Sequence, residues 1–237
     1  MSLMKELIKG KVKTVYAVDD VERVMIMYHD KVTAGNGEKE DHPVGKGEIN
    51  CAISTELFKL IKGLSIRTHH IATVGPTMLC HKVDIIPIEV VVRNIAAGSI
   101  VRQTTIEEGT VFETPLIEFY LKDDDKNDPL LTKRRLRLMG YDLHKEIEPL
   151  EQMAHDVNYK LKRIFDMIGL TLVDFKLEFG YDSQGTLLLA DELSPDGMRL
   201  WKKGTQESMD KDIFRKGDGN IVPVYQKILD NLLNISL

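Results

Sequence analysis

The chain has 237 residues, of which 43% are hydrophobic and 29% are charged, and its formal net charge is −5 at neutral pH. This length suits one large domain or two small ones, with enough residues to bury a substantial core. The negative charge excludes a general attraction to nucleic acid or to an anionic membrane, so any phosphate ligand must be held by local basic residues. Two distant cysteines, a start without a signal-peptide core and the lack of any membrane-length apolar run predict a soluble cytoplasmic protein with buried thiols.

The first eighty or so residues predict mainly strands joined by tight turns. Residues 7–18 alternate between apolar and polar side chains, and a turn leads from them into an apolar strand at 24–28. Lys11 and Lys13 share one face of the first strand beside Gly10, a pattern that suits the binding of nucleotide phosphates. Gly-Lys pairs are common, and the sequence has neither the full P-loop pattern nor a Gly-x-Gly-x-x-Gly fingerprint, so neither of those folds is indicated.

The rest of this region is predicted to contain a flexible loop at 33–37 and a mobile polar lid at 42–47. An amphipathic helix is predicted at 48–62, and three short strands are predicted at 66–68, 71–74 and 77–83. Gly63 follows the helix and is expected to end it. His69 and His70 have no third ligand at a useful spacing, which favours a surface pair over a metal site.

An extended apolar run at residues 85–93 marks the expected domain boundary, between residues 1–84 and 85–237. Pro87 within the run suits an edge strand or an inter-domain crossing. Arg93 and Ser99 flank a turn of small residues, and a guanidinium with a hydroxyl could hold a phosphate there. An ordinary strand-to-helix turn explains the same residues equally well.

Two helices and two charged segments are predicted in the second half of the chain. Apolar residues at helical spacing predict a long packing helix over 145–168 and a last amphipathic helix over 225–233. The charged segments are a loop at 123–129 and a helix end at 209–216.

The strand at residues 172–180 carries the most informative pattern. Val173, Phe175, Leu177 and Phe179 alternate with charged residues and form the expected core face. The opposite face carries Asp174, Lys176 and Glu178. A return strand at 186–192, after a four-residue loop, would place Asp191 opposite Lys176 on that charged face.

Carboxylates beside a lysine on one surface predict a site for Mg²⁺ and phosphate, because magnesium takes hard oxygen ligands from one or two carboxylates and from phosphates. A merely solvated charged face is the alternative interpretation. A tight turn at 194–199 is expected to bring Asp196 and Arg199 to the end of the same surface.

Several long segments together resemble one protein family, the SAICAR synthetases (phosphoribosylaminoimidazole-succinocarboxamide synthases) of purine biosynthesis. The matching motifs include Gly-Lys-Val-Lys-Thr-Val-Tyr and Asp-Glu-Leu-Ser-Pro-Asp-Gly-Met-Arg-Leu-Trp, and the segments are 10–16, 86–93 with 97–99, 122–129, 172–180, 191–201 and 209–212. At Asn36 the sequence departs from the family, in which aspartate is common.

The resemblance implies an α+β fold with two lobes, loosely like protein kinases and ATP-grasp enzymes. An antiparallel N-terminal sheet lobe would clasp ATP against a larger C-terminal α+β lobe that holds substrate and metal. It also implies the reaction of ATP, carboxyaminoimidazole ribonucleotide (CAIR) and L-aspartate to SAICAR, ADP and phosphate, through an acyl phosphate. The implied partners are these small molecules and Mg²⁺, without nucleic acid or membrane, in a homodimer or higher homo-oligomer.

The resemblance also implies roles for individual residues. Lys11 and Lys13 would hold the ATP phosphates, Glu178 and Asp191 would ligate Mg²⁺, and Lys176 would compensate charge during transfer. The expected nucleotide contacts further include Gly10, Lys82, Asp84 and Ile86, the expected substrate contacts are Arg93, Ser99, Asp128, Asp196, Arg199 and Lys211, and the other expected catalytic residues are Asp174 and Lys122.

Within these roles, some alternatives stay open. Asp174 and Asp196 would contact the substrate's amine or ribose, or would orient the neighbouring lysine and arginine. A small-molecule kinase would need the same ATP site but no amine substrate, and a non-catalytic nucleotide-binding module would not depend on Lys176.

Overall fold

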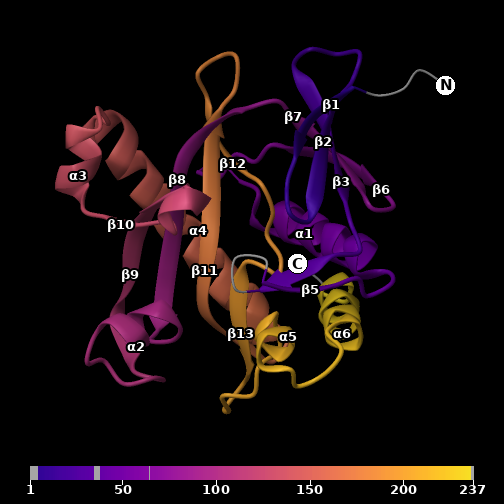
Figure 1. Ribbon diagram of the computed structural model, residues 1–237, viewed down its shortest axis with the longest axis vertical. Helices are drawn as coiled ribbons and strands as arrows, with labels where there is room; N and C mark the ends of the chain where they lie inside the picture. Colours follow the sequence, from indigo (N-terminus) through magenta and orange to yellow (C-terminus); the bar gives the residue numbers. More distant parts are fainter. Residues whose placement is uncertain (1–4, 35–37, 64, 236–237) are drawn as a thin grey trace.

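The computed structural model describes residues 5–34, 38–63 and 65–235 of the chain (Figure 1). The expected loop at 33–37 lies outside these residues at positions 35–37, and so does the departure at Asn36. The strands are β1 Glu6–Lys9, β2 Lys13–Ala17, β3 Arg23–Tyr28, β4 Val32–Ala34, β5 Lys39–Asp41, β6 His70–Val74, β7 Thr77–His81, β8 Asp84–Ile95, β9 Val111–Leu121, β10 Leu130–Leu131, β11 Leu170–Tyr181, β12 Leu187–Ala190 and β13 Met198–Lys202. The helices are α1 Lys46–Ile61, α2 Ser99–Gln103, α3 Lys133–Leu138, α4 Glu148–Met167, α5 Asp212–Lys216 and α6 Val222–Leu233, with short helical turns at Asp124–Lys126 and Leu143–Ile147.

The strands of the first half of the chain form an antiparallel sheet in the order β1-β2-β3-β7-β6. The single strand predicted at 7–18 is wrong, because the chain folds back after Gly10 into the antiparallel pair β1 and β2. Lys11 therefore lies in the turn and Lys13 begins β2. The strand predicted at 66–68 is also absent, and only Thr68 forms an isolated bridge, to Leu189 of β12.

The second sheet has the order β10-β9-β8-β11-β12, with β13 also paired to β11 (Figure 1). β8 lies between β9 and β11, so of the two alternatives for Pro87 the edge strand is wrong. Pro87 instead falls in an irregularity of the β8–β11 pairing, where residues 85 and 89 of β8 lie opposite Gly180 and Glu178. The missing proline N–H is tolerated where the ladder is already interrupted.

β11 buries an apolar face, but with one exception to the predicted alternation. Phe175, Leu177 and Phe179 belong to the main core, as predicted. Val173 lies instead in a separate small cluster with Trp201, because the pairing of β11 with β13 contains a bulge between Leu172 and Asp174. A bulge inserts one unpaired residue and so reverses the face of the side chain at that position.

The predicted pairing of the β11–β12 hairpin is wrong by one residue. Tyr181 lies opposite Leu187 and Glu178 opposite Ala190, so Asp191 would point to the apolar face if the strand continued. The strand ends at Ala190, and Asp191 adopts a left-handed conformation with φ of 56°. This turn brings the carboxylate of Asp191 to the charged side of the sheet. The sequence predicted the same side, but from a strand pairing that is wrong.

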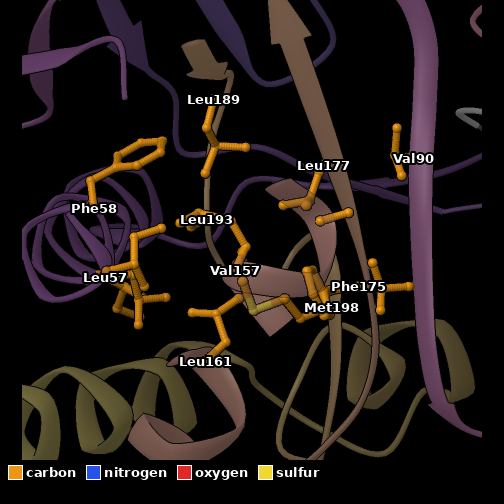
Figure 2. Close-up of a cluster of buried hydrophobic side chains, with 14 of the residues drawn as sticks. Leu57, Phe58, Val90, Val157, Leu161, Phe175, Leu177, Leu189, Leu193 and Met198 are labelled. Carbon is orange, nitrogen blue, oxygen red and sulfur yellow. The ribbon is translucent and has the colours of Figure 1, made fainter. Parts of the chain in front are cut away.

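Two long helices connect the sheets. α4 packs on β8, β9 and β11, and α1 packs on β3, β6 and β7 as well as on α4 and α6. Figure 2 shows the shared core, in which Leu57 and Phe58 of α1 face a cluster that includes Leu177 of β11 and Leu161 of α4. The apolar residues of α1 therefore join both sheets into one interior.

The two segments around α1 differ from expectation. The stretch at 42–47 was predicted to be a mobile lid, but Asp30 accepts hydrogen bonds from the N–H groups of Gly45 and Gly47, and Lys46 is only 1% exposed. His69 and His70 are buried, so the prediction of a surface pair is wrong.

Cys51 and Cys80 are buried free thiols, as predicted. No helix within the described ranges has the length and apolar character needed to cross a membrane.

Candidate active site

Two cavities adjoin where the first sheet faces β11. The larger has a volume of about 720 Å³ and is lined by the β1–β2 turn, by Glu89, Lys176 and Glu178 of the second sheet, and by the segment after β12. The smaller has about 340 Å³ and lies over β8, β11, β13 and α5. Their shared wall consists of Lys176, Asp196, Gly197 and Lys211.

A lysine and two glutamates form the floor of the larger cavity. The Lys176 ammonium lies 2.6 Å from Oε1 of Glu89 and 3.2 Å from Oε1 of Glu178. Lys122 of the β9–β10 connection forms a second ion pair with Glu178. Burial alone would lower the pKa of Lys176, but the carboxylates of Glu178 and Glu89 outweigh it and raise that pKa, so the ammonium stays charged at neutral pH.

Lys13 at the start of β2 reaches across to the segment after β12. Its ammonium lies 2.6 Å from Asp191 and 2.8 Å from Glu192. Burial alone would raise the pKa of Asp191, but the positive charges of Lys13 and Lys176 lower it below its usual range. The left-handed turn at Asp191 therefore supplies a permanently ionised carboxylate to the cavity that also contains Glu178.

The smaller cavity contains a nearly buried arginine–carboxylate cluster. Asp174 accepts hydrogen bonds of 2.8 Å from Nη1 of Arg93 and from Nη1 of Arg199. Nη2 of Arg93 also donates to the hydroxyl of Ser99 at 2.7 Å. Burial raises the pKa of Asp174, while Arg199 and Arg93 oppose that change. The two guanidinium groups, fixed side by side, suit the binding of a phosphate.

Gly98 permits this arrangement of Arg199. Its φ is +67° and its ψ is −124°, a conformation that residues with a Cβ avoid. A Cβ at this position would lie 2.5 Å from Nη2 of Arg199. Arg199 itself belongs to β13 and pairs with Asp174 in the sheet. The tight turn predicted to carry Arg199 therefore ends before β13 begins at Met198.

Asp196 in the shared wall is held by side chains from two helices. Lys46 of α1 forms an ion pair with it, and the Tyr225 hydroxyl of α6 donates to Oδ1 at 2.9 Å. Asn50, one turn after Lys46, donates to Asp196 at 3.3 Å and to Glu192 at 3.0 Å. Burial alone would raise the pKa of Asp196, but Lys46 and Lys211 lower it. Asp196 is therefore an ionised acceptor whose position is fixed.

The remaining expected residues divide between the cavities and other places. Gly10, Lys11 and Asp128 line the larger cavity, and the carboxylate of Asp128 also accepts the N–H of Asp123 at 2.9 Å. Lys211 lines both cavities. The expected nucleotide contacts Lys82, Asp84 and Ile86 line neither: Lys82 and Asp84 are exposed near the start of β8, and Ile86 is buried.

Sequence reasoning missed four side chains of this site: Glu89, Glu192, Lys46 and Tyr225. Glu89 lies in an apolar run and Glu192 beside an expected site residue, and a single charge at such places is a weak but usable signal. Lys46 fell in a segment interpreted as a lid, and Tyr225 counted only as part of an apolar helix stripe. Their roles depend on the packing of α1 against α6, which no local pattern indicates.

The donor set of the larger cavity fits a magnesium ion that is shared with a nucleotide. Within the described ranges, no group of three or more histidine, cysteine, aspartate and glutamate side chains is arranged to hold a metal. Magnesium in phosphate-transfer sites needs only one or two carboxylates, because phosphate oxygens and water complete its shell. Glu178 and Asp191 supply two such carboxylates to one cavity.

Comparisons with known proteins agree with this geometry. The model of the family described as SAICAR synthetase matches residues 6–232. A phosphoribosylaminoimidazole-succinocarboxamide synthase from Staphylococcus carnosus is 45% identical over 230 residues, which cover 97% of this chain and 98% of that protein.

Solved structures of the same kind superpose closely. The phosphoribosylaminoimidazole-succinocarboxamide synthase from Ehrlichia chaffeensis has a TM-score of 0.93 and 36% identity, covering 98% of this chain and 100% of that one. A type-2 SAICAR synthetase in complex with ADP has a TM-score of 0.92 and 37% identity, with 97% and 98% covered. The mixed α+β architecture with antiparallel sheets is thus confirmed, and the chain belongs to the SAICAR synthetase family.

Proposed function

We propose that this chain joins L-aspartate to the carboxylate of CAIR in de novo purine biosynthesis, with ATP as the energy source, and releases SAICAR, ADP and phosphate. One observation carries the assignment to this site: a cavity rich in lysine and carboxylate shares a wall with a cavity rich in arginine. This arrangement suits a nucleotide and a ribonucleotide whose reacting groups meet at the common wall.

The reaction requires activation of an unreactive group. A carboxylate carbon resists attack by an amine because it is electron-rich and lacks a leaving group. Transfer of the γ-phosphoryl group to a carboxylate oxygen of CAIR breaks the bond to ADP and forms an acyl phosphate. The aspartate amine then attacks the carboxyl carbon, phosphate leaves with the bonding electrons, and the nitrogen loses a proton. Such transfers depend mainly on positioning and on charge compensation.

In the larger cavity, Lys11 and Lys13 hold the nucleotide phosphates in this proposal, next to Gly10. Lys176 faces the transferred group and compensates negative charge that grows during transfer, because its ammonium is held by Glu89 and Glu178 and stays protonated. Lys122 and Asp128 close the cavity from the β9–β10 connection.

Glu178 and Asp191 are the proposed ligands of Mg²⁺. When bound, the ion would neutralise phosphate charge next to the substrate carboxylate. In the structure, Lys122 and Lys176 bind Glu178, and Lys13 binds Asp191. These lysines hold both carboxylates at the cavity, and the positive charges of Lys13 and Lys176 lower the pKa of Asp191, which favours the ionised form that a magnesium ligand requires.

In the smaller cavity, Arg93, Ser99 and Arg199 bind the 5′-phosphate of the ribonucleotide in this proposal. Asp174 orients both guanidinium groups, because it accepts hydrogen bonds from each of them. Asp196 lines both cavities at their junction, and in this proposal it accepts a hydrogen bond from the amine or ribose of the substrate.

The proposal extends to the whole chain. Residues 1–84 form the lobe that clasps ATP, residues 85–237 form the substrate and metal lobe, and adenine lies near the crossing between Lys82 and Ile86. We place the enzyme in the cytoplasm as a homodimer or higher homo-oligomer. Cross-linking and light scattering would measure the oligomeric state.

The decisive experiment is a coupled assay of ADP release with each co-substrate left out in turn. The ligase requires ATP, CAIR and L-aspartate together, and omission of any one should reduce ADP release to background. Steady ADP release without L-aspartate, with a stable phosphorylated product, would instead identify a small-molecule kinase.

A further inference from the structure

Lys211 differs from the other lysines and arginines described in the two cavities in its lack of a partner carboxylate. Lys13, Lys122 and Lys176 each form an ion pair with a carboxylate, and Arg93 and Arg199 share Asp174. The ammonium of Lys211, which is half-buried just before α5, has neither a hydrogen bond nor an ion pair with any residue in the described ranges.

The surroundings of Lys211 do not supply that counter-charge. Burial lowers its pKa, and attraction by Asp196 only partly opposes this effect. Asp196 already accepts from Lys46, Asn50 and Tyr225, and its side chain is 5% exposed. A half-buried ammonium without a partner is costly. An anion that binds beside Lys211 would remove this cost, so the position is suited to a negatively charged ligand.

The place of Lys211 narrows the choice of that anion. Lys211 lines both cavities and shares their common wall with Lys176, Asp196 and Gly197. In the proposed function the acyl phosphate forms at this junction, because the nucleotide approaches from one cavity and the ribonucleotide from the other. The attacking amine must arrive at the same point, and a carboxylate of L-aspartate lies only one or two carbon atoms away from its amine.

The other anions of the reaction have cations of their own. Lys11 and Lys13 face the nucleotide phosphates, and Arg93 and Arg199 lie together at the far end of the smaller cavity. The amine substrate brings two further carboxylates into the site, and Lys211 is the half-buried ammonium left to receive one of them.

We propose that the ammonium of Lys211 binds one carboxylate of L-aspartate and thereby holds the amine at the junction of the two cavities. This assignment rests on the proposed function and adds to it the location of the amine substrate.

The test compares Lys211→Met with Lys216→Met, which removes the same charge from an exposed lysine at the other end of α5. A lost charge-assisted hydrogen bond should raise the KM for L-aspartate about 10- to 100-fold. The KM values for ATP and CAIR should stay within about twofold, and Lys216→Met should resemble the unchanged enzyme in all three.

Two truncated amines sharpen the result. β-Alanine lacks the α-carboxylate of L-aspartate and L-alanine lacks the side-chain carboxylate. Lys211→Met should reduce kcat/KM for one of these amines as strongly as for L-aspartate, and should have almost no further effect on the other. The insensitive amine identifies the carboxylate that Lys211 binds.

Other outcomes would overturn the inference. A rise confined to the KM for CAIR or for ATP would assign Lys211 to that substrate, and equal losses for L-aspartate and both truncated amines would show that it binds neither carboxylate. If Lys211→Met does not fold, Lys211→Arg, which keeps the charge, must leave the KM for CAIR unchanged and alter only that for L-aspartate. These results are separate from the proposed function, which depends on whether the unchanged enzyme needs L-aspartate at all.

Discussion

Lys176 has the environment of a charge-compensating group rather than of a proton acceptor. Its ammonium lies between Glu89 and Glu178, and these carboxylates raise its pKa even though burial acts in the opposite direction. A lysine that stays protonated at all physiological pH values cannot accept a proton from the attacking amine. In the proposed function, Lys176 acts instead through the positive charge that it would place beside the transferred phosphoryl group.

Replacement of Lys176 by methionine should therefore lower kcat by about 10²-fold or more, because the lost charge acts in the transition state. The measurement is steady-state ADP release at saturating substrates. Lys133→Met is the matched control, since Lys133 also forms an ion pair, with Glu151, but on the exposed surface of α3 and α4. Full activity in Lys176→Met would contradict the proposed role.

His69 offers a test of pH dependence that is independent of catalysis. The side chain is 2% exposed, and within the described ranges its Nε2 atom has no hydrogen-bond partner. Burial lowers the pKa of His69 from 6.5 to about 4. Between these values the unfolded chain binds more protons than the folded protein, so the free energy of unfolding should fall as the pH falls from 6.5 to 4.

His69→Gln should remove this contribution and flatten the dependence by at most about 1.4 kcal/mol per pH unit. Urea unfolding between pH 4 and pH 7 measures the slope, and His155→Gln, at an exposed position of α4, controls for the loss of a histidine. Parallel slopes for His69→Gln and the unchanged protein would contradict the buried neutral state.

At the scale of elements, the sequence predicts strands and helices well where periodicity is strong, and fails where a single residue breaks it. α1, α4, α6 and β11 lie close to the predicted ranges. The bulge at Val173 and the left-handed turn at Asp191 each shift a side chain to the other face. Neither is visible in the alternation of side chains, because both depend on how a neighbouring strand ends or pairs.

The same limit applies to the site. The charged residues of β11 and of the segment after β12 were predictable because they interrupt an apolar pattern. Lys46 and Tyr225 could not be assigned, since they reach Asp196 only after α1 and α6 have packed together. The need for a glycine at position 98 likewise follows only from its contact with Arg199 in the folded protein.

Gly98→Ala should weaken the binding of CAIR and leave the binding of ATP nearly unchanged. The new Cβ would meet the guanidinium of Arg199 at 2.5 Å, and Arg199 is tied to Asp174 and Asp212. We expect the KM for CAIR to rise by about tenfold, with a loss of about 1–3 kcal/mol in stability from backbone strain. Steady-state kinetics and urea unfolding measure the two effects.

Gly140→Ala separates these two effects. Gly140 also has a positive φ, of +102°, but a Cβ there would have no neighbour within 4 Å. This control should lose stability without any change in the KM for CAIR. An equal change of KM in both variants would show that backbone strain, and not the displacement of Arg199, weakens binding.

At the scale of the whole molecule, the larger cavity joins residues from distant parts of the chain. Lys13 belongs to the first sheet, Glu178 to the second, and Asp191 to the segment that follows β12. A nucleotide with magnesium bound there would contact all three parts at once. Ligand binding should therefore oppose the separation of the two sheets as well as global unfolding.

ADP with Mg²⁺ at about one hundred times the dissociation constant should raise the free energy of unfolding by about 2.7 kcal/mol. Thermal unfolding with and without ADP measures the shift, and removal of the metal with EDTA should reduce it. EDTA without nucleotide is the control and should have no effect. An ADP-induced shift that EDTA leaves unchanged would contradict the proposed metal ligands Glu178 and Asp191.

The hydrogen bond from Tyr225 to Asp196 has a consequence for the synthesis of the chain on the ribosome. Ribosomes make proteins from the amino terminus onward, so α6 emerges after every other part of the site has been synthesised. A nascent chain, or one cut short by a stop codon before Val222, would have Asp196 without its tyrosine and α1 without its covering helix. We expect such a product to be inactive, because the contact that fixes Asp196 in the shared wall of the two cavities forms only after α6 has been synthesised.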